Sequence, residues 1–200
     1  MQINDGIGRG YLLKVDSKNR AHVMATRISE IGYVAQTTND SYTISTNSFT
    51  FNSTNEHPIV YIKNTNSTKK LSFTIAHYGW NGGDTNYNRC MIKRVYKNIS
   101  PPTANYESLV PQNTYFESLR TADANVYKWD ESASDGMTVD TSGLSVFSTS
   151  CVSSGGVTLS DFIECVILDY NSSILFTYQP EEIGKASLTL YFFFNYCHCD

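Results

Sequence analysis

Apolar and polar residues alternate along much of this chain, and this period of two limits the fold more than any other feature. In residues 70–78 (KLSFTIAHY) every second side chain is expected on one face, namely Leu71, Phe73, Ile75 and His77. Residues 41–51 (SYTISTNSFTF) and 173–178 (SILFTY) repeat the pattern. Successive side chains of a β-strand point to opposite faces of a sheet, so these segments are predicted to be half-buried strands.

Two further runs are apolar on nearly both faces. They are residues 162–168 (FIECVIL) and 188–194 (LTLYFFF). Such strands lie in the middle of a sandwich or at a contact between subunits. Polar turn sequences separate the strands at short intervals, and no segment of any length shows the 3.6-residue period of an amphipathic helix. The sequence therefore predicts an all-β chain, a single antiparallel β-sandwich with a jelly-roll-like topology.

The expected domain organisation follows from the length of the chain and from the position of its irregular sequence. Two hundred residues suffice for one β domain with a substantial core. The glycine-rich residues 1–10 are expected to form an extended N-terminal arm, and residues 11–200 the sandwich. Residues 98–143 lack a clear period and are expected to be an inserted, loop-rich region with a short hairpin. Long structured loops on a β scaffold are common places for contacts with partners.

Charge and composition argue against several classes of function. The formal net charge is −4, and only 17% of the residues are charged. A nucleic-acid interface needs a basic stripe, which the sequence lacks, so no nucleic-acid partner is expected. The longest strongly apolar run is too short for a membrane-spanning helix, and the start of the chain lacks the pattern of a secretory signal. Five cysteines, an odd number, fit folding in a reducing cytoplasm.

The start of the chain, NDGIGRGYLLKV, is the one stretch that suggests a nucleotide-binding loop. Gly6, Gly8 and Gly10 lie on alternate positions just before the first apolar run. A phosphate-binding loop follows a strand and opens a helix. Here no strand precedes the glycines and nothing helical follows them. We therefore expect no nucleotide or other cofactor, and glycines that let the arm lie close against other backbone.

The C-terminal sequence CHCD suggests a metal site. If this segment is a strand, Cys197 and Cys199 point to one face and His198 to the other, so the three ligands do not converge. No CxxC pair or His pair elsewhere completes a tetrahedral site. No metal is expected, and free thiols are the preferred interpretation.

The sequence offers little for catalysis. It has no Gly-x-Ser-x-Gly elbow, and its four histidines lie in separate segments. A glycosidase needs two converging carboxylates. The candidates are acidic residues in predicted turns, namely Asp130, Glu131, Asp135, Glu181 and Glu182. Adjacent acidic residues in turns are usually solvated, so no enzymatic activity is expected.

Two tryptophans stand at predicted loops. Trp80 lies in HYGWNGG and Trp129 in VYKWDES, and several tyrosines accompany them, including Tyr106, Tyr115 and Tyr127. Exposed aromatic rings next to Asn and Asp stack on sugar rings or anchor protein interfaces. The alternative interpretation is that these rings fill the open ends of the sandwich. The sequence leaves the three interpretations open.

Several short segments resemble a group of small all-β virion proteins of tailed bacteriophages. The start of the chain is similar to their pattern Gly-Asp-Gly-x-Gly-x-Gly-Tyr/Phe-Leu-x-x-Val. Asn4 stands in place of the leading glycine, and the residues in register are Asp5, Gly6, Gly8, Gly10, Tyr11, Leu12 and Val15. Residues 17–23 (SKNRAHV) resemble the turn into the group's second strand, with Asn19, Arg20 and His22 matching. Further likenesses lie in residues 53–64 (STNEHPIVYIKN), 124–131 (ANVYKWDE) and 178–186 (YQPEEIGKA), whereas the CHCD ending departs from the group.

This resemblance implies a non-enzymatic structural protein of a phage particle, assembled in the host bacterial cytoplasm and located in the virion, most plausibly on the capsid surface. The expected function is that of a decoration or cement protein that stabilises the head by binding the major capsid protein or other virion proteins. A homo-oligomer is expected, with a trimer as the first choice. The residues predicted to make protein contacts are Asp5, Gly6, Gly8, Gly10, Tyr11, Trp80, Trp129, Phe192 and Phe194. Alternatives are a tail, neck or fibre-base component and a carbohydrate-binding module for host recognition.

Overall fold

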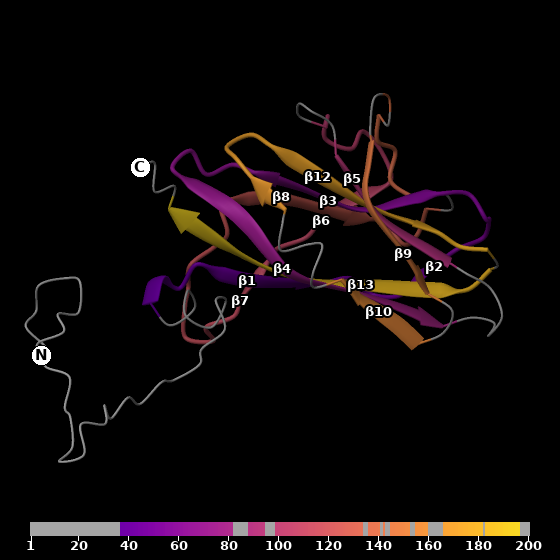
Figure 1. Cartoon of the computed structure of the whole chain (residues 1–200), viewed down its shortest axis with the longest axis horizontal. Coiled ribbons are helices and arrows are strands. Elements are labelled where there is room, and N and C mark those ends of the chain that lie inside the picture. The colour runs from indigo at the N-terminus through magenta and orange to yellow at the C-terminus, as the bar shows by residue number, and fades with distance from the viewer. Residues whose placement is uncertain are drawn as a thin grey trace, which may run out of the picture.

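The computed structural model describes residues 37–81, 88–94, 99–133, 136–140, 142, 145–152, 155–159, 166–181 and 183–196. These residues form two antiparallel sheets that face each other in two layers (Figure 1). The all-β class and the antiparallel sandwich are therefore confirmed. The predicted arm, residues 1–10, lies outside the described residues.

The first sheet has the strand order β10-β4-β13-β1-β7. Its long central strands are β4 (Lys69–Asn81) and β13 (Lys185–Tyr196), which pair along most of their length. The other members are β10 (Gly155–Leu159), β1 (Ser41–Ser45) and β7 (Gln112–Asn113). Two short strands join at its edges, β2 (Phe49–Thr50) on β13 and β11 (Ile167–Leu168) on β4.

The second sheet has the strand order β6-β8-β3-β12-β5-β9. Its central strands are β3 (His57–Asn64) and β12 (Ser173–Gln179), and β5 (Asn88–Arg94) and β9 (Ser145–Val152) follow on one side. On the other side lie β8 (Ala124–Trp129) and the short β6 (Tyr106–Ser108). The described part of the predicted loop-rich region thus contributes β6 and β7, and β8 is a full member of the second sheet.

The interior between the sheets is filled by aromatic and aliphatic side chains from the alternating segments. Tyr42 and Ile44 of β1 are buried, as the period of two predicts. Phe73 of β4 meets Phe176 of β12 across the interior, with ring centroids 5.9 Å apart. The strand β12 is buried on both faces, because it lies in the middle of its sheet and nearly all its side chains are covered.

The alternation in β4 changes phase, and this corrects one prediction. A β-bulge at Thr74 sets Phe73 opposite Phe192 and Ile75 opposite Tyr191. Two residues of the bulged strand oppose one of the partner, so every later side chain turns to the other face. Ala76, which was predicted to face outward, is buried, whereas His77 is exposed. His77 therefore does not lie on the apolar face.

The two doubly apolar runs have different positions. Residues 188–194 belong to β13 in the middle of the first sheet, as predicted for a central strand. Of residues 162–168, the structure describes Val166 and β11. Val166 and Leu168 are buried, whereas Ile167 is 56% exposed. This described part is a short edge strand on β4 and not a central one.

Candidate protein-interaction surface

The loop between β6 and β8, residues 109–123, carries the most exposed apolar side chains among the described residues. Phe116 is 101% exposed and Leu119 is 98% exposed. Val110 in the same loop is 65% exposed, and Tyr115 and the neighbouring Tyr106 are partly exposed. Isolated exposed hydrophobic residues are normal on a protein surface. Five of them lie within residues 106–119, so this segment is rich in exposed apolar side chains, which protein contacts commonly use.

The first half of the β6–β8 loop is attached to the sandwich through β7. Gln112 and Asn113 pair with Thr43 and Tyr42 of β1. The Asn113 side-chain amide donates to the Asn39 carbonyl oxygen over 2.7 Å, and its Oδ1 accepts the Tyr115 N–H over 2.9 Å. One asparagine side chain therefore both anchors the loop and fixes the turn that leads into Phe116.

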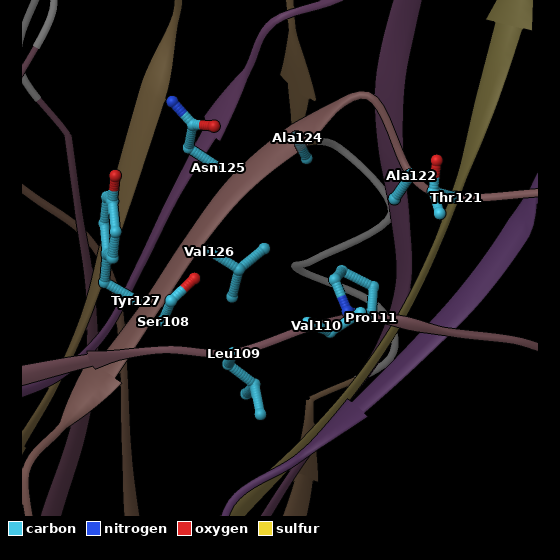
Figure 2. A pocket seen from close by; sticks show the side chains of 10 residues that line it. All are labelled: Ser108, Leu109, Val110, Pro111, Thr121, Ala122, Ala124, Asn125, Val126 and Tyr127. Atoms are coloured by element: carbon cyan, nitrogen blue, oxygen red, sulfur yellow. The ribbon is translucent and has the colours of Figure 1, made fainter.

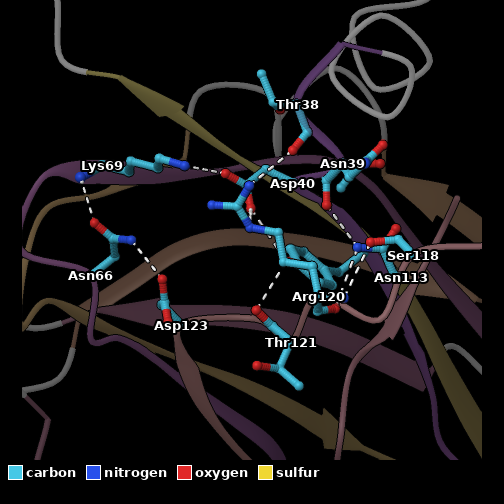
Figure 3. Close-up of polar contacts among 12 residues, drawn as sticks. Thr38, Asn39, Asp40, Asn66, Lys69, Asn113, Ser118, Arg120, Thr121 and Asp123 are labelled. Carbon is cyan, nitrogen blue, oxygen red and sulfur yellow. Dashed lines mark hydrogen bonds and ion pairs between the residues drawn. The ribbon is translucent and has the colours of Figure 1, made fainter.

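The second half of the loop is attached through Arg120, as Figure 3 shows. Arg120 Nε lies 2.7 Å from Asp40 Oδ1, and its guanidinium donates to the Thr38 carbonyl oxygen over 3.0 Å. Asp40 is buried and also binds the buried Lys69 ammonium. An arginine and a lysine thus share one buried carboxylate, and a buried charge is retained only when it is paired in this way.

Tyr42 connects Asp40 to the end of the β6–β8 loop. Its hydroxyl donates to the Thr121 carbonyl oxygen over 3.0 Å and lies 3.3 Å from Asp40 Oδ1. Burial, followed by the nearby Asp40 charge, raises the pKa of the Tyr42 hydroxyl well above its ordinary value. The hydroxyl therefore stays protonated and remains a donor at neutral pH. Both ends of the stretch that bears Phe116 and Leu119 are thus tied to the sandwich.

A pocket of about 190 Å³ lies where the loop meets the second sheet. Figure 2 shows residues 108–111 along one side and residues 121–127 along the other. Its lining mixes apolar and polar groups, and the lining residues are Ser108, Leu109, Val110, Pro111, Thr121, Ala122, Ala124, Asn125, Val126 and Tyr127. None of these ten side chains is a carboxylate or an imidazole. Tyr127 is the titratable side chain in this lining, and the apolar side chains Leu109, Val110, Pro111, Ala122, Ala124 and Val126 lie beside polar ones.

Charged side chains lie around this apolar area. Glu117 accepts a hydrogen bond from the Tyr115 hydroxyl over 3.2 Å, and Asp123 accepts one from Asn66 over 2.7 Å. Neither carboxylate forms an ion pair within the part of the chain that the structure describes. Arg120, although paired with Asp40, keeps 44% of its side chain exposed. The loop therefore combines apolar groups with charges that are accessible to a partner.

On the strand beside the pocket, Lys128 carries a local ion network. Its ammonium lies 3.0 Å from Glu131 and 3.1 Å from Glu107. Burial alone would lower the pKa of Lys128, but the hydrogen bonds that its ammonium donates to the two carboxylates raise it above its ordinary value. The network satisfies a largely buried lysine in β8, so it stabilises the strand that forms one wall of the pocket.

The structure corrects the assignment of Trp80 and Trp129 to a contact surface. Trp80 is 5% exposed and Trp129 is 1% exposed. Trp129 stacks parallel to the ring of His57 with centroids 5.5 Å apart, and Trp80 stacks on Tyr178 at 5.6 Å. Phe51 lies among these rings, 5.0 Å from Tyr178. Both tryptophans fill the sandwich interior, so neither presents a face to a partner or a sugar.

The assignment of Phe192 and Phe194 to a contact surface is corrected in the same way. Their exposed fractions are 0% and 4%. Phe192 stacks on Tyr42 with ring centroids 5.8 Å apart, and Phe194 meets Tyr42 edge-on at 5.9 Å. The closing strand β13 buries these rings within its own chain because β1 pairs beside it.

Several predicted residues lie outside the described part of the chain. They are Asp5, Gly6, Gly8, Gly10 and Tyr11 of the arm, the CHCD residues Cys197, His198 and Cys199, and the acidic residues Asp135 and Glu182. Among the residues that are described, no group of three or more His, Cys, Asp or Glu side chains is placed to hold a metal ion. Cys90 is buried and takes part in no disulfide bond.

The candidate catalytic carboxylates that are described have other partners. Asp130 accepts hydrogen bonds from the Ser132 hydroxyl over 2.7 Å and the Ser132 backbone N–H over 2.9 Å, and these bonds lower its pKa. Glu131 binds Lys128. Both carboxylates have partners within one turn, and the sequence also predicts a turn at these residues. Glu181 is exposed in the connection before β13 and does not line the pocket.

The sequence analysis missed Phe116 and Leu119. Tyr106 and Tyr115 were considered among the loop aromatics, but the fully exposed side chains beside them were not. The available signal was the apolar content of residues 114–119 (TYFESL) within an otherwise polar loop region. That signal does not distinguish a buried loop residue from an exposed one, because the difference depends on contacts with Thr38 and Asn39, far away in the sequence.

Comparison with models of protein families, with curated proteins and with solved structures finds no match to this chain. Within the described residues, no helix is both long enough and apolar enough to cross a membrane. The account of function therefore rests on the surface described above and on the resemblance carried by the sequence motifs.

Proposed function

We propose that this protein is a non-enzymatic structural component of a phage particle, a capsid decoration or cement protein that binds protein neighbours through its β6–β8 loop. The observation that carries the binding role is the full exposure of Phe116 and Leu119 on a loop whose two ends are attached to the sandwich. The virion location follows from the resemblance of the sequence motifs to phage virion proteins.

The attachment of the loop supports binding because it lowers the entropic cost of association. A side chain held in place before binding loses less freedom on binding than one on a loose loop. Buried aromatic anchors contribute most of the energy of a protein interface, roughly 2 kcal/mol or more each. Exposed Phe and Leu side chains on a structured loop are suited to this role.

We also infer that the sandwich is a jelly roll. In the order β1-β13-β4-β10 of the first sheet and β3-β12-β5-β9 of the second, β1 pairs with β13, β3 with β12, β4 with β10 and β5 with β9, so early strands of the described chain pair with late ones. Most connections cross between the sheets, as from β3 to β4 and from β12 to β13. β8 and β6 extend the second sheet beyond β3. Jelly rolls are common in viral capsid proteins and in lectins, so this topology is compatible with a virion role but does not by itself establish one.

The carbohydrate-binding alternative loses its proposed contacts because Trp80 and Trp129 are buried. Tyr106, which is 42% exposed, meets the half-buried Tyr127 edge to face, with ring centroids 5.0 Å apart. This is a packed pair and not a flat platform on which a sugar ring would stack.

A particle-binding experiment tests the proposal. The double variant Phe116→Asp with Leu119→Asp places two charges in the contact while leaving the sandwich interior untouched. We expect its occupancy on purified particles to fall to less than about a tenth of the native value. Ile183→Asp, at a residue that is 69% exposed in the connection between β12 and β13, serves as the control and is expected to bind normally. Equal occupancy of the double variant and the native chain would refute a contact through this loop.

A further inference from the structure

We infer that Arg120 is an ion-pair latch, which positions the β6–β8 loop for binding and opens without unfolding the sandwich. The latch consists of the Arg120 guanidinium, the Asp40 carboxylate and the Thr38 carbonyl oxygen (Figure 3). Its effect on binding rests on the proposed function of the loop, whereas the latch itself is measurable on the free chain.

The exposed turn, residues 115–119, is held on the sandwich through its two ends. Inside the turn, the Ser118 N–H donates to the Tyr115 carbonyl oxygen over 2.9 Å. Among the described residues, the hydrogen bonds formed by residues 115–119 reach no further than Asn113 on one side and Arg120 on the other. The position of the turn therefore depends on how these two ends are attached.

The two ends are attached in different ways. Before the turn, the Thr114 N–H donates to the Ser41 carbonyl oxygen over 2.9 Å, which continues the pairing of β7 with β1. After the turn, the attachment is a side chain: Arg120 Nε lies 2.7 Å from Asp40 Oδ1, and the guanidinium donates to the Thr38 carbonyl oxygen over 3.0 Å. A substitution at Arg120 therefore releases one end of the turn and leaves the pairing of the sheet intact.

Asp40 keeps its interior partners when the latch opens. Its Oδ2 binds the buried Lys69 ammonium, and its Oδ1 also lies 3.3 Å from the Tyr42 hydroxyl. The buried carboxylate thus remains paired without Arg120, and large losses of stability follow only when a buried charge is left without a partner. Arg120 is 44% exposed, so water solvates the released guanidinium. The Tyr42 hydroxyl still holds the Thr121 carbonyl oxygen, so opening is confined to the turn.

A closed latch lowers the cost of binding. A turn fixed at both ends holds Phe116 and Leu119 in one arrangement before a partner arrives, whereas an open latch adds conformations that binding must remove. Arg120 is therefore a positioning residue that acts through Asp40. Salt screens a partly exposed ion pair, because the Debye length falls to about 3 Å at 1 M salt. High ionic strength is therefore expected to open the latch.

Hydrogen–deuterium exchange of the purified full chain measures the latch, through the mass of the fragment that contains residues 115–120. We expect Arg120→Gln to speed exchange there roughly fivefold, and 1 M NaCl to do the same in the native chain but not in the variant. Arg120→Lys restores a charge beside Asp40 and is expected to give an intermediate rate. Lys70→Gln is the matched control, because Lys70 is 40% exposed and pairs with Asp169 at the surface over 3.1 Å.

Urea unfolding and particle binding distinguish the possible results. The inference predicts that Arg120→Gln keeps the native urea midpoint and binds particles roughly fivefold more weakly. Native exchange rates in Arg120→Gln, or a urea midpoint lowered as far as in Asp40→Asn, would overturn it. Weaker particle binding without faster exchange would mean that Arg120 touches the partner directly, which also overturns it. Faster exchange with unchanged particle binding would leave the latch in place and contradict the proposed function of the loop.

Discussion

At the scale of single residues, the interior of the sandwich is built more from ring packing than from hydrogen bonds. His57, Trp80, Trp129 and Tyr178 stack around Phe51, yet the indole N–H groups of both tryptophans and the Tyr178 hydroxyl have no hydrogen-bond partner among the described residues. A buried polar group without a partner costs roughly 1–3 kcal/mol. The interior therefore contains polar atoms whose removal should not destabilise the fold.

Tyr178 provides a direct prediction from this arrangement. Burial raises the pKa of its hydroxyl far above the ordinary value of 10.0. Above pH 10 the unfolded chain releases the Tyr178 proton while the folded chain retains it, so the contribution of this group to stability is complete below pH 10 and is lost as the pH rises. The loss is about 1.4 kcal/mol per pH unit. Tyr178→Phe is expected to fold at least as stably at pH 7 and to lose stability less steeply between pH 10 and 11.5.

The measurement is urea unfolding of the native chain and of Tyr178→Phe at several pH values. The quantity compared is the slope of the unfolding free energy against pH above pH 10, in the native chain and in Tyr178→Phe. Superimposable pH profiles for the two proteins would show that Tyr178 ionises equally in the folded and unfolded chains, contrary to its burial.

Asp40 provides the second prediction at this scale. Its carboxylate binds the buried Lys69 and also Arg120. Asp40→Asn removes the negative charge that both cations share and is expected to destabilise the chain by about 3 kcal/mol, since breaking a buried ion pair is costly. Asp169→Asn is the matched control, because Asp169 is 68% exposed and its pair with Lys70 lies at the surface. That change is expected to cost less than about 1 kcal/mol. Chemical unfolding of both variants checks the contrast, and equal costs would contradict it.

At the scale of elements, the connection between β12 and β13 illustrates how closely the sheets are packed. A Cβ at Gly184 would lie 2.4 Å from the Trp80 ring, whereas one at Gly79 would lie 2.7 Å from the Ser187 hydroxyl. The serine hydroxyl can rotate away, but the indole is held by Tyr178 and Phe51. Gly184→Ala is therefore expected to cost about 1–3 kcal/mol, and Gly79→Ala clearly less. Thermal unfolding of the two variants tests this order, and the reverse order would contradict the packing described for Trp80.

The strands also show how far sequence alone determines this fold. The period of two predicts β1 and β12, and the doubly apolar run predicts the central position of β13. Which face of the sheet each β4 side chain takes after Thr74 could not be predicted, because the bulge depends on pairing with β13. β8 lies within residues 98–143, which were predicted to be loops with a short hairpin because they lack a clear period, and its Lys128 meets Glu107 and Glu131 only in the folded chain.

The candidate surface was predictable only in part. The sequence indicates that protein contacts belong to the loop-rich region, but it assigns the anchors to tryptophans that the structure buries. Whether an aromatic residue next to a turn packs inward depends on the far side of the sandwich, which the local pattern does not contain. Phe116 is held outward because Asn113 binds Asn39, 74 residues earlier in the chain.

At the scale of the whole molecule, two sheets with an aromatic interior support the β6–β8 loop, on which Phe116 and Leu119 are exposed. A rigid scaffold that carries an exposed contact loop suits a protein that acts by adhesion. Under the proposed function, many copies of this loop would add contacts across a particle surface without any chemical step.

The copy number of the protein per particle, relative to the major capsid protein, tests the proposed role most directly. Quantitative mass spectrometry of purified particles gives this ratio without any substitution in the chain. A decoration protein is predicted to be present in hundreds of copies. A dozen copies or fewer would indicate a tail or neck component, and absence from the particle would contradict the virion role altogether.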